Sequence, residues 1–156
     1  MAKYNFTAER KIKNAAYRNH IHADLADQLY EKILHKMVVE KKYRDPTYNA
    51  QILAKELETN ARCISAVVNL RFNMNYSCLV NEYRVREAQY LLVDKRYADK
   101  TIEKISAMVG FNNRQSFYAA FYRFLGTTPN EYRIQNTKEQ TRKKRTPKKA
   151  AQAETK

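Results

Sequence analysis

The chain of 156 residues contains very little glycine and proline: it has two glycines, three prolines and no tryptophan. An all-β fold needs many tight turns, and those turns draw heavily on glycine and proline. The composition therefore argues against a sandwich or barrel and favours an all-α fold. Both glycines, Gly110 and Gly126, follow apolar residues at helical spacing, where a residue with positive φ commonly ends a helix.

Long apolar runs and cysteine clusters are missing too. No apolar stretch approaches the roughly 20 residues that cross a bilayer, and the first residues lack the apolar core of a secretory signal. Cys63 and Cys78 do not have zinc-ligand spacing, so we interpret them as small core thiols of a cytosolic protein. No phosphate-binding glycine loop or nucleophile–base pair is present either. We therefore expect no metal, no cofactor and no enzymatic activity.

Positive charge dominates the composition, with 30 Lys and Arg against 16 acidic residues and a net charge of +14. Eight basic and two acidic residues lie from Lys138 onward, so the rest of the chain is positive as well. Such a surplus favours a polyanionic partner, either nucleic acid or an anionic membrane surface. The stretch 138–156 has the composition of a disordered tail, which is expected to attract phosphate without sequence choice.

The most informative segment runs from Ile102 to Arg133. Apolar residues at helical spacing predict a helix that ends at Gly110, and Asn113 can N-cap a second helix that ends at Gly126. Thr128-Pro129-Asn130-Glu131 then offers a capping box for a third helix. This order of helix, turn and helix is typical of the helix-turn-helix motif. The apolar positions of the first two helices are Ile102, Ile105, Val109, Phe117, Phe121 and Leu125.

A second copy of this pattern lies earlier in the chain. Leu53-Ala54 corresponds to Ile105-Ser106, 52 residues later, and Asn60 corresponds to Asn113, 53 residues later. The one-residue difference falls in the turn. Both copies place an asparagine before a helix with apolar residues at i and i+4, so two helix-turn-helix units are the economical explanation. The alternative is a pair of unrelated amphipathic helix pairs.

Two longer helices are expected, one before the first unit and one between the two units. Residues 24–43 predict an amphipathic helix that Arg44-Asp45-Pro46 ends. This helix either packs on the first unit or offers a dimerising or partner-binding face. Residues 75–93 predict one continuous helix of about 28 Å, close to the roughly 34–36 Å of one turn of B-DNA. A helix of that length suits a rigid spacer between two reading units on one side of a duplex.

Residues from about 45 to 133 resemble a complete DNA-binding domain of the AraC/XylS family of transcription regulators. The resemblance implies about seven helices in two helix-turn-helix subdomains joined by a long linker helix. Asn73 stands where many members carry glycine, and asparagine tolerates the left-handed conformation. The matching elements are Leu53-Ala54, Ile64-Ser65, residues 81–88, Ile105-Ser106, Val109-Gly110-Phe111, Ser116-Phe117, Phe121, Gly126, Thr128-Pro129 and Tyr132-Arg133.

The predicted organisation is all-α, with a loosely ordered arm at residues 1–23, a DNA-binding domain at 24–137 and a basic disordered tail at 138–156. Its three parts are the first helix-turn-helix subdomain (24–74), the linker helix (75–93) and the second subdomain (94–137).

The second helix of each unit is expected to enter a major groove with its first residues near base edges. Arginine suits guanine, and glutamine suits adenine. Helical spacing places Arg62, Ser65, Arg114, Gln115 and Tyr118 outward, and the family resemblance implies the full set of candidates. For base reading they are Arg62, Ser65, Ala66, Arg114, Gln115, Tyr118 and Ala119; for phosphate positioning they are Asn60, Asn69, Asn113 and Arg123.

Ala66 and Ala119 depart from the family, because several members carry a base-reading arginine there. Alanine can touch a thymine methyl group but cannot form a bidentate hydrogen bond. Specificity then rests on Arg62 and Arg114, or on DNA shape. A phosphate contact, or simple exposure to solvent, is the alternative for each arginine.

These features predict a sequence-specific, double-stranded DNA-binding transcription regulator of the bacterial cytoplasm, associated with the nucleoid. The resemblance implies activation through RNA polymerase. The first 44 residues are too few for a small-molecule effector domain, so we expect control by abundance, or else an output fragment of a longer sensor. The alternative function is a non-specific basic architectural or RNA-binding protein whose tyrosines stack on single-stranded bases.

Overall fold

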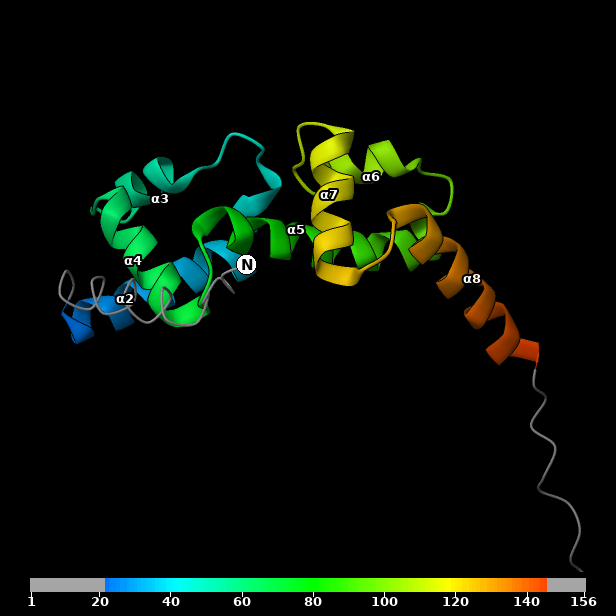
Figure 1. Cartoon of the computed structure of the whole chain (residues 1–156), viewed down its shortest axis with the longest axis horizontal. Coiled ribbons are helices and arrows are strands. Elements are labelled where there is room, and N and C mark those ends of the chain that lie inside the picture. Colours follow the sequence, from blue (N-terminus) through cyan, green and yellow to red (C-terminus); the bar gives the residue numbers. More distant parts are fainter. Residues whose placement is uncertain (1–21, 146–156) are drawn as a thin grey trace, which may run out of the picture.

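The computed structural model describes residues 22–145, with side chains described as far as residue 137. All secondary-structure elements in this part of the chain are helices and none is a strand, which confirms the predicted fold class. Two groups of helices lie at the two ends of a central helix, α5 (Figure 1). The α-helices are α2 (Ala23–Leu34), α3 (Ala50–Glu56), α4 (Ala61–Phe72), α5 (Tyr76–Val93), α6 (Ile102–Met108), α7 (Arg114–Leu125) and α8 (Pro129–Arg145).

The N-terminal unit consists of α2, α3, α4 and the first half of α5 around one apolar core. Ile33 of α2, Leu53 of α3 and Ile64 of α4 are completely buried there. Helix α2 contributes Leu29 and Ile33 to this core, so it packs on the first helix-turn-helix unit. This confirms the first of the two expectations for this helix.

The expected helix over residues 24–43 is shorter in the structure. After α2 ends at Leu34, the chain forms a π-helical turn at His35–Val39 and a 3-10 turn at Lys42–Arg44. Lys41 between them adopts a left-handed conformation with φ 51°. After this reversal, the ring of Tyr43 packs into the N-terminal core and stacks on Tyr83 of α5, with ring centroids 5.7 Å apart. The break therefore comes from tertiary packing and precedes the expected stop at Pro46.

The C-terminal unit packs α6, α7 and α8 against the second half of α5. Its centre is aromatic: Phe117 and Phe121 are completely buried, and their ring centroids lie 5.6 Å apart. Phe111 and Tyr132 extend this group, with centroids 5.1 Å from Phe117 and 5.6 Å from Phe121 respectively. These contacts hold the apolar side of α7 and leave its opposite side outward.

The central helix α5 serves both cores with different faces. Leu79 and Val80 belong to the N-terminal core, whereas Ala88 and Leu92 belong to the C-terminal core. Asn75 caps the helix, since its carboxamide oxygen accepts a hydrogen bond of 2.8 Å from the backbone N–H of Cys78. The linker helix predicted from the sequence is thus present, and its 18 residues are continuous.

The predicted helix ends are confirmed by their backbone conformations. Gly110 and Gly126 have φ of 100° and 67°, and Asn73 adopts the left-handed conformation with φ 55°. The capping box forms as expected: the backbone N–H of Thr128 donates to Glu131 at 3.1 Å, and the backbone N–H of Glu131 donates to the Thr128 hydroxyl at 3.3 Å.

Helix α8 continues to Arg145, past the tail boundary expected at Lys138. A capped start and a run of Lys, Arg, Glu and Gln, all good helix formers, account for the extension. The expectations for the rest of the tail and for the N-terminal arm fall at residues 146–156 and 1–21, outside the described residues. Among the described helices, none combines the length and apolar character needed to cross a membrane.

Candidate nucleic-acid interface

Helices α4 and α7, the second helices of the two units, begin in the same way. The Asn60 side chain accepts a hydrogen bond of 2.9 Å from the backbone N–H of Cys63, and that of Asn113 accepts one of 2.8 Å from Ser116. Both predicted N-caps are confirmed. Each helix therefore starts at a capped, exposed end whose remaining backbone N–H groups can attract an anion.

In the C-terminal unit, the start of α7 presents an outward polar side. Arg114, Gln115 and Ala119 are exposed, and Tyr118 is half-buried. The Arg114 guanidinium carbon lies 4.9 Å from the centroid of the Tyr118 ring, which gives a cation–π contact. The structure thus brings together the four base-reading candidates of this unit.

Arg114 also has a partner that sequence reasoning missed. Its guanidinium lies 3.3 Å from the carboxylate of Glu103 on α6, and both side chains are more than half exposed. An exposed pair of this kind is weak, about 0–1 kcal/mol. Arg114 can therefore exchange Glu103 for an acceptor on a ligand at little cost.

In the N-terminal unit, only part of the expected reading side is accessible. Arg62 is exposed and Ser65 half-buried, but Ala66 is 0% exposed. Residues 66, 67 and 68 are all buried, so the covered side of α4 is wider than an i, i+4 stripe. The expected outward position of Ala66 is thus corrected, because its methyl group is not available to a thymine.

The phosphate-positioning candidates differ in how free they are. Asn60, Asn113 and Arg123 are exposed, and the two asparagines use their carboxamide oxygens as caps. Asn69 is half-buried, and its amide donates to the carbonyl of Ser65 at 2.8 Å. Asn69 therefore serves its own helix in this structure.

Arg84 of α5 connects the two units. Its Nε donates to the carbonyl oxygen of Tyr43 at 2.7 Å, and its Nη2 donates to that of Asp45 at 3.1 Å. Its guanidinium carbon also lies 5.5 Å from the centroid of the Phe111 ring in the C-terminal unit. Burial lowers the pKa of this arginine, which nevertheless stays charged at neutral pH. Arg84 thus ties the segment 43–45 to the turn of the second helix-turn-helix.

Glu87, one turn later on α5, binds two basic residues of the chain between α2 and α3, Lys41 and Arg44. Its carboxylate accepts hydrogen bonds from Lys41 at 3.2 Å and from the Nε of Arg44 at 2.9 Å, and its side chain is only 10% exposed. Burial opposes the ionisation of Glu87, but the hydrogen bonds from Arg44 and Lys41 outweigh it, so the pKa of its carboxyl lies below the usual value. Glu87 therefore remains ionised at neutral pH.

Gly110 provides the third contact between the units. A Cβ atom at this position would lie 2.7 Å from the carbonyl oxygen of Arg44 and still closer to that of Tyr43. The glycine was predicted only as a helix end. The structure adds that the N-terminal unit's backbone packs directly on this turn, which a side chain would prevent.

Comparison with known proteins identifies the architecture. Residues 53–135 match a family model described as a helix-turn-helix domain, of the AraC type. The chain belongs to this family. Its members are DNA-binding transcription regulators. No curated protein gives a significant match to the chain.

Several solved structures share the fold. One is the C-terminal domain of the two-component response regulator yesN from Fusobacterium nucleatum: it is 22% identical, with a TM-score of 0.58 over 67% of this chain and 98% of that domain. A DNA-binding transcriptional dual regulator from Escherichia coli K-12 is 21% identical, with a TM-score of 0.55 over 64% of this chain and 86% of its own. The C-terminal domain of AraT, a response regulator from Geobacillus stearothermophilus, is 21% identical, with a TM-score of 0.57 over 64% and 80%.

Proposed function

We propose that this protein is a sequence-specific transcription regulator that binds double-stranded DNA with α4 and α7 in successive major-groove segments. The observation that carries the proposal is the pair of helices with identical asparagine caps, placed at the two ends of one continuous helix. Family membership supports the DNA-binding function, and the net charge of +14 suits a polyanionic partner.

The connection between the units supports a concerted reading of DNA. Arg84, Glu87 and Gly110 hold the 41–45 segment against the linker and the second turn. Helix α5 has 18 residues and spans about 27 Å at 1.5 Å per residue. A fixed separation of this order suits two grooves on one side of the duplex, about 34–36 Å apart.

Within this proposal, the reading residues are the accessible ones. Arg62 and Ser65 act in the first groove, and Arg114, Gln115, Tyr118 and Ala119 act in the second. Asn60, Asn113 and Arg123 position the phosphates. The site of action is the bacterial nucleoid, and contact with RNA polymerase is the family's route to activation.

Selection of bound sites from a random duplex library tests the proposal. The expected motif has two short blocks with centres about 10–10.5 base pairs apart, bound by one protein molecule. Exposed tyrosines favour a second candidate, a non-specific single-strand or RNA binder, because Tyr90 and Tyr122 are 61% and 62% exposed. A library that returns no motif, together with tighter binding to single strands, would support that candidate instead.

Substitution of the outward arginines separates base reading from phosphate attraction. Arg114→Ala is expected to cost about 1–3 kcal/mol on the selected site and to relax the preference at one base pair. Arg123→Ala is the matched control on the same helix, and it should weaken selected and random duplexes by the same factor. Titrations of both variants on both duplexes measure the difference. Equal losses for Arg114→Ala on the two duplexes would make Arg114 a positioning residue.

A further inference from the structure

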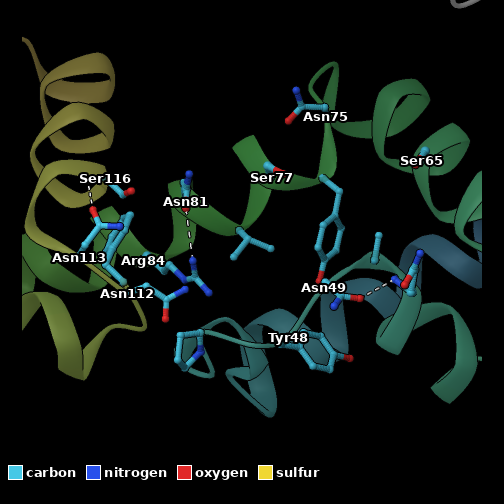
Figure 2. Close-up of a pocket in the computed structure, with 16 residues that line it drawn as sticks. Tyr48, Asn49, Ser65, Asn75, Ser77, Asn81, Arg84, Asn112, Asn113 and Ser116 are labelled. Carbon is cyan, nitrogen blue, oxygen red and sulfur yellow. Dashed lines mark hydrogen bonds between the residues drawn. The ribbon is translucent and has the colours of Figure 1, made fainter.

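A polar cleft of about 870 Å³ lies between the two units (Figure 2). Six carboxamide side chains and three serine hydroxyls line it, and Arg84 is the only charged side chain among the described residues of its wall. The lining therefore offers many hydrogen-bond donors and no carboxylate. That chemistry suits a ligand rich in acceptor oxygens and negative charge.

The cleft lies between the two recognition helices. Ser65 of α4 lines it from one side, and Asn113 and Ser116 of α7 line it from the other. In Figure 2, Asn75, Ser77 and Asn81 of α5 lie between these two groups. A molecule that contacts Ser65 of α4 together with Asn113 and Ser116 of α7 would lie against this wall.

Two long helices begin at the cleft. Asn75 caps α5, which has 18 residues, and Asn113 caps α7, which has 12. Both capping residues line the cleft, so the positive ends of two helix dipoles meet there.

An independent feature of the same wall is a hydroxyl without a partner. Tyr76 lines the cleft and is 9% exposed, and its hydroxyl has no hydrogen-bond partner in the described structure. Buried hydroxyls are normally paired. The wall of the cleft thus contains a buried polar group that has no hydrogen-bond partner among the described residues.

We propose that this cleft binds the sugar–phosphate backbone of DNA where one strand passes between the two major-groove segments. The inference rests on the proposed function, because it takes the two recognition helices to lie in adjacent grooves. A phosphodiester offers acceptor oxygens and a negative charge, which match the donors, the two helix ends and Arg84. The cleft therefore adds affinity for duplex and fixes the register of the two units, without reading bases.

Ser77→Glu tests the cleft without weakening the fold. Ser77 is exposed and is the second residue of α5. An acidic side chain at this position interacts favourably with the helix dipole and stabilises the helix. A carboxylate there should repel phosphate, so binding to selected and random duplexes should fall by about tenfold or more, while the melting temperature does not fall. Ser77→Gln, similar in size but neutral, should bind almost as the wild type does.

Asn130→Glu is the matched control. Asn130 is also exposed and is the second residue of α8, and it does not line the cleft. Each change adds one negative charge at the second residue of its helix. A loss of affinity for Ser77→Glu no larger than that for Asn130→Glu would overturn the proposal.

Neutral methylphosphonates locate the contact on DNA. Placed at the phosphates between the two blocks of the selected site, they should weaken wild-type binding and affect Ser77→Glu little further. A wild-type protein that is indifferent to them would contradict the proposal even if the selected site is preferred. If no selected site exists, the proposed function fails, and the comparison of Ser77→Glu with Asn130→Glu on random duplex still tests the cleft.

Discussion

Replacing Gly110 with alanine is expected to lower the free energy of unfolding by about 3 kcal/mol or more, because two costs add. A left-handed φ, here 100°, strains any residue with a Cβ. The new methyl group would also meet the carbonyl oxygens of Tyr43 and Arg44, and backbone atoms cannot rotate away as a flexible side chain can. Urea unfolding of the wild type and the variant measures the change.

Gly126→Ala is the control for the conformational part of this cost. Gly126 has φ of 67°, but nothing lies within 4 Å of a Cβ built there. The expected loss is about 1 kcal/mol, from backbone strain alone. Equal losses for the two variants would show that the segment 43–45 moves freely away from the turn. The units would then not be held in one arrangement by this contact.

Much of the fold is readable from the sequence because its signals are local. Asn60, Asn75 and Asn113 cap helices through hydrogen bonds to residues three positions later. Gly110 and Gly126 end helices through their own φ values. Such features depend on a few consecutive residues, and a sequence pattern contains all the information that they need.

Elements that depend on distant contacts were less predictable. The reversal after Leu34 serves the packing of Tyr43, which periodicity along residues 24–43 does not reveal. Ala66 is buried although the family resemblance places it among the base-reading residues. In both cases tertiary packing decides the outcome, and local propensity is only a weak guide to it.

The site divides in the same way. The exposed start of α7, with Arg114 and Gln115, follows from the Asn113 cap and the phenylalanine stripe. The ion pair of Arg114 with Glu103 and the contacts of Glu87 with the 41–44 segment join residues far apart in the chain. No spacing rule relates such residues, so only the folded structure shows that residues 41–45 are held against α5 and the second turn.

The central claim is that the two units read one duplex together from the same side. The direct measurement is a competition at fixed, near-physiological salt among three duplexes: the selected site, the same site with five base pairs inserted between its blocks, and random sequence. We expect the selected site to bind about 4 kcal/mol or more tighter than random duplex. The insertion turns the second block by about half a helical turn to the opposite side of the duplex, so most of that preference should disappear. Equal affinity for all three duplexes, or an insertion without effect, would contradict the account.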